Sequence, residues 1–145
     1  MEKSKKFYII GKYKTLHNIE RVVKMDKAVM ILRKCHINVR YKGYKYIPEA
    51  VKIVGDLMDD NKDTIRMTKD VYPVIAEKYN TSPGNIEAAI RNTIEKCWKN
   101  NKRYVQEVLG YKPLKCPSNT EFIDAIVFCI KYNRQLDEDF NYSAG

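Results

Sequence analysis

The spacing of apolar side chains predicts a helical protein. From about residue 24 onward, apolar residues repeat every three or four positions, as they do on the buried face of a helix. The repeat occurs in six stretches, whose apolar residues are, in chain order, Met25, Ala28, Val29, Ile31 and Leu32; Ile47, Ala50, Val51, Val54, Leu57 and Met58; Val71, Ile75 and Tyr79; Ile86, Ile90, Ile94, Cys97 and Trp98; Val105, Val108 and Leu109; and Phe122, Ile123, Ile126, Cys129 and Ile130. We therefore expect an all-α domain of about six helices over residues 25–134.

The two ends of the chain do not share this pattern. Residues 1–24 form a basic N-terminal extension, in which residues 7–10 fit either a short strand or the start of a helix. Residues 135–145 form an acidic, polar tail. The sequence thus divides into an extension of uncertain structure, one helical domain and a tail.

Residue types that begin or end helices mark several boundaries. Ser82 is a favoured N-cap, and Pro83 then takes the first helical position, where its missing N–H costs nothing. Gly110 suits the C-terminal cap of the fifth helix. Ser118 with Glu121 three residues later forms a capping-box pattern at the start of the last helix.

Other boundaries rest on weaker signals. The first helix is expected to end before a turn at Lys42-Gly43, and Pro48 is expected in the first turn of the second helix. The third helix is expected to open near Thr68 or Lys69.

The charge is high and unevenly distributed. The 145 residues carry a formal net charge of +9. Residues 1–45 hold 13 basic and 3 acidic side chains, and residues 82–115 hold 7 and 3, whereas the remaining stretches are mildly acidic. Such basic stretches favour a polyanionic partner, although a soluble protein without one can be equally basic. No run approaches the ~18 apolar residues of a membrane span, and the N-terminus lacks a signal-peptide core, so we expect a cytoplasmic protein.

The sequence contains no recognisable catalytic or metal-binding pattern. The gaps of 62, 19 and 13 residues between successive cysteines include no Cys-x-x-Cys pair, which favours ordinary packing roles for Cys35, Cys97, Cys116 and Cys129. The aspartates of residues 56–63 lack the spacing and turn glycine of a calcium loop. Since no nucleophile–base pair or phosphate loop can be assembled either, we expect no metal, no cofactor and no enzymatic activity.

A tight turn joins the third and fourth predicted helices. Residues 80–82 are too few for a flexible linker. The offsets of Ala76, Asn80 and Ile86 resemble a helix-turn-helix, with a small residue where the helices approach, a turn residue that tolerates a left-handed backbone, and a branched apolar residue that packs the second helix beside Ile90. Because such helix pairs also occur in proteins that bind no DNA, this pattern alone leaves the function open.

The exposed face of the fourth predicted helix carries side chains that can recognise bases. Arginine can bond guanine bidentately, asparagine can do so with adenine, glutamate can accept from cytosine N4, and a small alanine permits close approach. The predicted base-reading residues are Asn85, Glu87, Ala88, Arg91 and Asn92, and the predicted phosphate-contacting residues are Ser82, Lys96, Lys99, Lys102 and Arg103. On this chemistry alone, a solvated face with ion pairs among Glu87, Arg91 and Glu95 is a slightly better interpretation.

An ordered set of motifs over roughly 100 residues resembles one family. The motifs are Lys42-Gly43-Tyr44-x-Tyr46 with Glu49-Ala50; Thr68-Lys69-x-Val71-Tyr72-Pro73-x-Ile75-Ala76; Tyr79-Asn80-Thr81; Ile86-Glu87-x-Ala89-Ile90-Arg91 with Ile94-Glu95 and Trp98; Leu109-Gly110-Tyr111; and Pro117-Ser118-Asn119-Thr120-Glu121-Phe122-Ile123. They are similar to the C-terminal DNA-binding effector domain of the stage-zero sporulation response regulator of endospore-forming bacteria. The resemblance implies a six-helix fold whose fourth helix reads the major groove of double-stranded promoter DNA. It also implies a homodimer on tandem sites and contact with the transcription machinery.

The sequence departs from the family's pattern in two ways. Full-length members carry a receiver domain before this module, and residues 1–24 are too short for one, so phosphotransfer on this chain is not expected unless it is part of a longer protein. The predicted recognition helix has Asn85, Ala88 and Asn92 where the family has Arg, Arg and His. We therefore expect a different or weaker DNA target, with the basic extension compensating through phosphates or a minor groove.

Three hypotheses for the function follow. The leading one is a sequence-specific regulator that binds double-stranded DNA. The alternative is a protein-interaction module or antagonist that keeps the fold but has lost specific DNA readout. The uncharged residues Asn85, Ala88 and Asn92, which stand where the family has basic ones, motivate this alternative. RNA binding through the lysine-flanked tyrosines of residues 8–46 ranks third, because Tyr44 and Tyr46 also match the family and fit packing roles.

Overall fold

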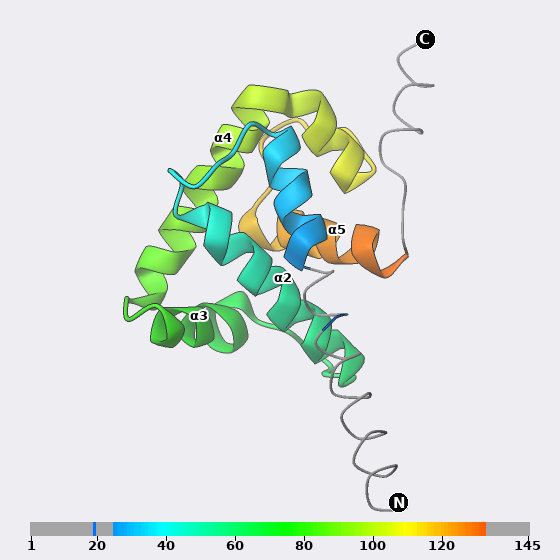
Figure 1. The fold of residues 1–145 in the computed structure, drawn as a ribbon. Coiled ribbons are helices and arrows are strands. Elements are labelled where there is room, and N and C mark those ends of the chain that lie inside the picture. The colour runs from blue at the N-terminus through cyan, green and yellow to red at the C-terminus, as the bar shows by residue number, and fades with distance from the viewer. Residues whose placement is uncertain (1–18, 20–24, 133–145) are drawn as a thin grey trace, which may run out of the picture.

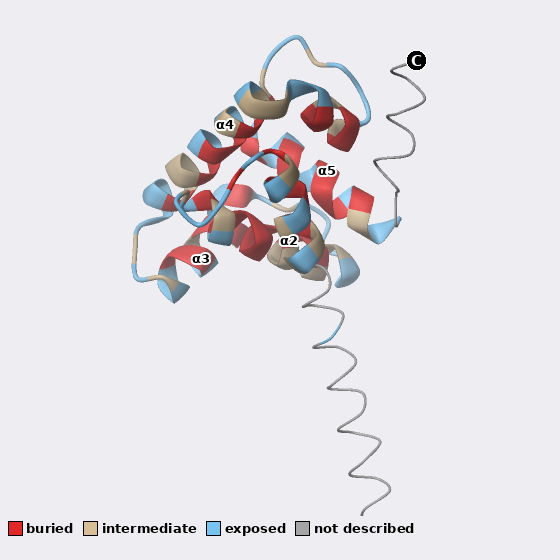
Figure 2. Cartoon of the chain, turned by 45° about the horizontal axis from the view of Figure 1, so that its top comes forward, coloured by how far each residue is buried: buried red, intermediate tan, exposed pale blue. Residues whose placement is uncertain are grey.

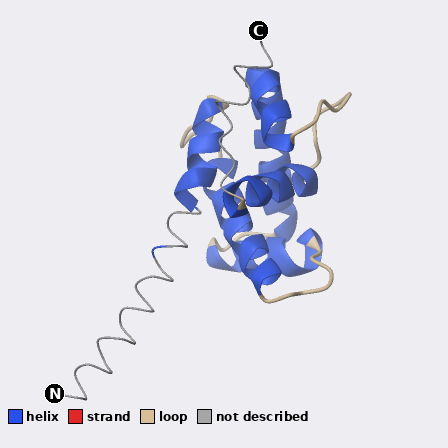
Figure 3. Cartoon of the chain, turned by 90° about the vertical axis from the view of Figure 1, so that its right-hand side faces the viewer, coloured by secondary structure: helices blue, strands red, loops and turns tan. Residues whose placement is uncertain are grey.

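The computed structural model describes residue 19 and residues 25–132, and all regular structure in this part of the chain is helical (Figures 1 and 3). The predicted all-α fold is therefore confirmed. The extension of residues 1–24, apart from Ile19, and the tail of residues 135–145 lie outside the described residues. The elements are a helix over residues 25–34, α2 (Gly43–Asp59), a π turn η1 (Met67–Val71), α3 (Tyr72–Lys78), α4 (Pro83–Leu109) and α5 (Asn119–Lys131).

One hydrophobic core lies between these helices. α2, α4 and α5 pack pairwise against one another, and α3 packs against both α4 and α2. Figure 2 shows that the buried residues lie on the inner faces of the helices. Leu32, Ile47, Ile90 and Phe122 come from four different helices and are all fully buried, each contributing about 1.5–3 kcal/mol relative to an exposed side chain. None of the described helices has the length and apolar character that crossing a membrane requires.

The cysteines pack as the sequence analysis expected. Cys35, Cys97 and Cys129 are buried, and Cys116 is half-buried. A hydrogen bond with Cys35, together with burial, raises the pKa of the Cys97 thiol. Cys97 therefore stays protonated and unreactive at neutral pH.

Three of the described helices are each followed by a residue that has the left-handed conformation and is not glycine. His36, Asn61 and Asn80 have φ values of 61°, 58° and 51°. In each case the following N–H donates back to a carbonyl in the last helical turn, as in a Schellman motif. These bonds run from Ile37 to Leu32, from Lys62 to Leu57 and from Thr81 to Ala76. Each helix end is thereby closed without a glycine.

The start of α2 lies directly against α4. A Cβ atom on Gly43 would stand 2.2 Å from Oγ1 and 2.6 Å from Cβ of Thr93, and 3.1 Å from the carbonyl oxygen of Ala89. Thr93 is itself buried, and its hydroxyl donates to the Ala89 carbonyl at 2.8 Å. Gly43, expected in a turn, is instead the first residue of α2, and it has no side chain because α4 occupies that space.

Helix α2 also begins earlier than the sequence predicted. Pro48 lies inside the helix, so its expected place in the first turn is wrong. The backbone is already turned before it, because the N–H of Tyr44 donates to the Tyr41 carbonyl at 3.0 Å and that of Tyr46 to the Lys42 carbonyl at 3.4 Å. The missing N–H of Pro48 thus removes one bond from an established helix.

The fourth and fifth predicted helices are the two helical segments of α4, which meet at a kink at Asn101 (Figure 1). Asn101 leaves the helical conformation, with φ −151° and ψ 66°. Its Oδ1 accepts from the Tyr104 N–H at 3.3 Å, which caps the segment that follows, and its Nδ2 donates to the Lys34 carbonyl at 3.0 Å. Asn100 donates to the Cys35 carbonyl at 3.0 Å. The end of the helix over residues 25–34 therefore holds the kink, and Gly110 (φ 84°) caps α4 as predicted.

Candidate nucleic-acid interface

A tight turn joins α3 and α4, as the sequence predicted. Residues 79–82 join the two helices, and Asn80 adopts the left-handed conformation expected of it. Ala76, Ile86 and Ile90 are 3%, 0% and 0% exposed. The small residue and the branched apolar residues therefore pack inside the pair, which holds the opposite face of α4 outward.

The first turn of α4 is held by side chains from the turn before it. Ser82 Oγ accepts from the Asn85 N–H at 3.1 Å, so Ser82 is the predicted N-cap, and Pro83 is the first helical residue. Asn85 Nδ2 also donates to Thr81 Oγ1 at 3.0 Å. The beginning of the predicted recognition helix is thus ordered independently of any ligand.

The predicted base-reading residues all lie on α4. Asn85, Arg91 and Asn92 are exposed, and Glu87 and Ala88 are half-buried. Arg91 Nη1 donates to both carboxylate oxygens of Glu87, at 2.6 and 2.8 Å. This is one of the i,i+4 ion pairs that the solvated-face interpretation expects, and it also holds a cationic fork at a defined place on the exposed surface.

The predicted phosphate-contacting residues extend along α4 and across its kink. Lys99, Lys102 and Arg103 are exposed, and Lys96 is half-buried. The ammonium of Lys102 lies 5.1 Å from the centre of the Trp98 ring, a cation–π contact that links the two sides of the bend. Because α4 changes direction at Asn101, Lys102 and Arg103 lie beyond the bend, whereas Lys96 and Lys99 lie before it.

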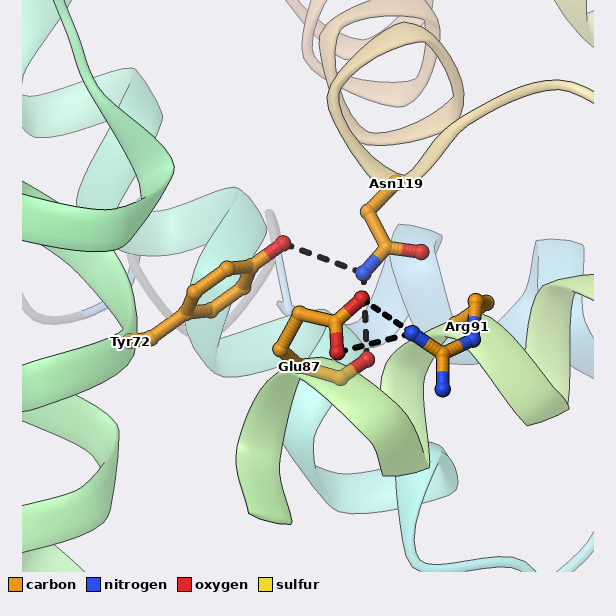
Figure 4. A network of polar contacts seen from close by, with 4 residues as sticks. All are labelled: Tyr72, Glu87, Arg91 and Asn119. Carbon is orange, nitrogen blue, oxygen red and sulfur yellow. Dashed lines mark hydrogen bonds and ion pairs between the residues drawn. The ribbon is translucent and has the colours of Figure 1, made fainter. Parts of the chain in front are cut away.

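A polar network missed in the sequence ties α4 to its neighbours (Figure 4). Asn119, the first residue of α5, donates from Nδ2 to the Tyr72 hydroxyl oxygen at 3.0 Å and to the Glu87 carbonyl oxygen at 3.1 Å. Burial raises the pKa of the Tyr72 hydroxyl, while the bond from Asn119 acts in the opposite direction. Asn119 was visible in a family motif, but nothing in the local sequence indicates its partners.

Beside this network, the surface is hollowed between α3, α4 and α5. The hollow has a volume of about 430 Å³, and its wall includes Thr68, Glu87, Arg91, Glu95 and Asn119. It therefore brings the Glu87–Arg91 ion pair next to the start of α5. The side of α4 that carries Glu87 and Arg91 is flanked by this recess.

A second group missed in the sequence holds α3 against α2. Glu49 is only 5% exposed, forms an ion pair with Lys78 and accepts from the Tyr79 hydroxyl at 3.3 Å. The hydrogen bond to Glu49 raises the pKa of Lys78 above its usual range. Lys45 caps the group, its ammonium 4.7 Å from the centre of the Tyr79 ring. These contacts fix the end of α3 immediately before the turn into α4.

A comparison with protein families identifies this arrangement. The family model described as "Sporulation initiation factor Spo0A C terminal" matches residues 28–130, which run from the helix over residues 25–34 nearly to the end of α5. The chain belongs to this family. The Spo0A C-terminal family is one of DNA-binding domains of sporulation transcription factors and is not an enzyme family. The family resemblance stated from the motifs is confirmed.

Proposed function

We propose that this chain is a sequence-specific transcription regulator that places α4 in the major groove of double-stranded DNA and performs no catalysis. The observation that carries the proposal is the exposed face of α4, where Asn85, Arg91 and Asn92 project outward from a helix whose first turn is capped and whose opposite face is buried. These side chains can form hydrogen bonds with base edges, and family membership supports a DNA partner.

The proposed division of roles follows the geometry. Asn85, Glu87, Ala88, Arg91 and Asn92 would contact bases, since they lie on the first half of α4. Phosphate contacts would come from Ser82 at the start of the helix and from the basic residues further along it, which are Lys96, Lys99, Lys102 and Arg103. The Ser82 hydroxyl can still donate to a phosphate while its oxygen caps α4.

The wider assignments are also proposals. Residues 25–134 would form the DNA-binding domain, residues 1–24 a basic arm that contacts phosphates or a minor groove, and residues 135–145 a polar tail. We propose a cytoplasmic location, binding as a homodimer on tandem sites and contact with the transcription machinery. Binding would require no metal or cofactor.

The test is a selection from random duplexes with the purified full chain, followed by Arg91→Ala. We expect the wild-type protein to enrich a short motif and the variant to bind it about ten- to a hundredfold more weakly, with relaxed preference at one position, because a bidentate base contact is worth roughly 1–3 kcal/mol. Lys131→Ala at the far end of α5 removes an equal charge and should leave the preference intact. Unchanged affinity and preference in Arg91→Ala would show that α4 is misassigned as the recognition helix.

A second candidate is a protein-interaction module or antagonist that keeps the fold without specific readout. Two observations favour it: uncharged side chains at Asn85, Ala88 and Asn92, and the engagement of Arg91 by Glu87 in the free protein. This candidate predicts no motif enrichment and no gel shift even at low salt. The same selection therefore separates the two functions.

A further inference from the structure

We propose that Asn119 is a positioning residue for DNA readout. Its side-chain amide, at the start of α5, holds the recognition helix α4 at Glu87. Glu87 in turn orients Arg91. This inference rests on the proposed function, because it states that a residue outside α4 influences how well α4 discriminates between bases. Asn119 would act without touching DNA.

The contacts of Asn119 join three elements at one atom. Its Nδ2 lies 3.0 Å from the Tyr72 hydroxyl at the start of α3 and 3.1 Å from the Glu87 carbonyl in α4 (Figure 4). An amide nitrogen carries two hydrogens, so each of these acceptors takes one. Asn119 is 9% exposed, and no N–H of its side chain remains for a phosphate or a base.

The link to readout runs through a single residue of α4. The Glu87 carbonyl receives the Asn119 amide, while the Glu87 carboxylate receives the guanidinium of Arg91 at 2.6 and 2.8 Å. A shift of the α4 backbone at this point would move the guanidinium with it. Base recognition depends on placing hydrogen-bonding groups to within a few tenths of an ångström, so this anchor affects discrimination more than overall attraction.

Helix α5 does not need the Asn119 side chain for its own start. Ser118 Oγ accepts from the Glu121 N–H at 3.2 Å, and the Glu121 carboxylate accepts from the Ser118 N–H at 3.3 Å, which completes a capping box. The side-chain amide of Asn119 is therefore available to donate to Tyr72 in α3 and to Glu87 in α4. Its burial between three elements has no other role in the contacts described.

The informative variant is Asn119→Asp. A carboxylate of the same shape can accept a hydrogen bond from the Tyr72 hydroxyl, which reverses the direction of the present bond, but it repels the Glu87 carbonyl instead of donating to it. A negative charge at the first position of α5 also favours that helix, which protects the fold. Tyr72→Phe is the second variant, because it removes the other acceptor and leaves the bond to Glu87.

The matched control is Tyr111→Phe. The Tyr111 hydroxyl donates to Glu121 Oε2 at 3.0 Å, at the same end of α5 but on the exposed side. The control therefore removes a tyrosine hydroxyl and one hydrogen bond to α5 without touching α4. Circular dichroism and thermal unfolding establish that each variant is folded at the assay temperature.

The measurement is the ratio of dissociation constants for the selected duplex and a scrambled duplex, over a series of salt concentrations. We expect Asn119→Asp to lower this discrimination about tenfold and Tyr72→Phe about threefold, in line with one lost or weakened hydrogen bond. The salt slope with scrambled DNA should change little, and Tyr111→Phe should match the wild type. Unchanged discrimination in a folded Asn119→Asp protein, or equal weakening on both duplexes, overturns the proposal.

Failure of the proposed function would be visible separately. If the wild-type chain prefers no duplex, the regulator hypothesis fails, and amide hydrogen exchange in α4 then tests the anchor. Faster exchange at residues 85–91 in Asn119→Asp than in Tyr111→Phe would support positioning of α4 by Asn119, and equal exchange would refute it.

Discussion

Gly43 sets how closely two helices approach. Its missing side chain allows the first turn of α2 to lie on α4 at Thr93, two residues after Arg91 and on the buried side of α4. Within a helix, glycine is usually unfavourable by up to about 1 kcal/mol relative to alanine. Here the contact with α4 outweighs that preference, because the space for a Cβ atom is already occupied.

Gly43→Ala should therefore destabilise the protein despite the better helix propensity of alanine. We expect a loss of about 1–3 kcal/mol in the free energy of unfolding, since Thr93 is buried and cannot move aside freely. Urea unfolding monitored by circular dichroism measures the effect. Gly84→Ala is the control, because the nearest heavy atom to its Cβ would be Ser82 Oγ at 3.9 Å, and it should be neutral or stabilising. A neutral Gly43→Ala would mean that α2 and α4 are further apart than described.

At the level of the element, α5 has the most completely defined start. The capping box of Ser118 and Glu121 is joined by the Tyr111 hydroxyl, which donates to the same carboxylate. Bonds from the Ser118 backbone and hydroxyl, followed by that from Tyr111, lower the pKa of Glu121 below its usual value of 4.5. The charged form of Glu121 is therefore the one that stabilises the folded protein.

This arrangement predicts a pH dependence. Because the folded-state pKa is lowered, the contribution of Glu121 is complete above about pH 4.5 and is lost as the pH falls through the folded value. Glu121→Gln keeps a side chain that can accept the capping bond but has no charge to lose. We expect the wild type to be more stable than this variant by about 0.5 kcal/mol at pH 7, with the difference shrinking as the pH falls below about 4.5. Urea unfolding between pH 3 and pH 7 measures it, and a constant difference would contradict the assignment.

For the whole molecule, the proposed function assigns the strength of DNA binding to charge and its selectivity to the exposed face of α4. The net charge of +9 is largely carried by residues 1–45 and 82–115. Phosphate contacts release counterions, so the logarithm of the binding constant should fall linearly with the logarithm of salt concentration. Affinity and discrimination should therefore respond to different substitutions.

Lys99→Gln tests this separation. Removing one phosphate contact should weaken binding to selected and scrambled duplexes alike and reduce the salt slope by about one, without changing the preferred sequence. Fluorescence anisotropy at four or more salt concentrations gives both quantities. Lys131→Gln at the end of α5 provides the charge-matched control. A change of preference in Lys99→Gln would instead place this residue at a base edge.

Local signals in the sequence correctly predicted both ends of α4 and the start of α5. The caps at Ser82, Gly110 and Ser118 and the left-handed turn at Asn80 depend on side chains or conformational preferences within four residues of each boundary. Such interactions can be recognised from short stretches of sequence. The kink at Asn101 was not predicted as such, because its partner carbonyl belongs to Lys34, 67 residues earlier.

The candidate site divides in the same way. Helical periodicity alone placed Asn85, Arg91 and Asn92 on an exposed face, and the structure agrees. The supports of that face were not predictable, since Asn119 reaches Glu87 across 32 residues and Glu49 reaches Lys78 across 29. Periodicity identifies a face but says nothing of which distant side chains will hold it.

The sequence by itself thus determined the helical fold, its caps, the family and the outward side chains of α4, because each depends on local spacing or on ordered motifs. Only the tertiary structure decided that Gly43 is a contact residue, that α4 bends at Asn101 and that Asn119 anchors Glu87. These features arise where segments distant in the sequence pack together, and their geometry depends on the shape of both partners.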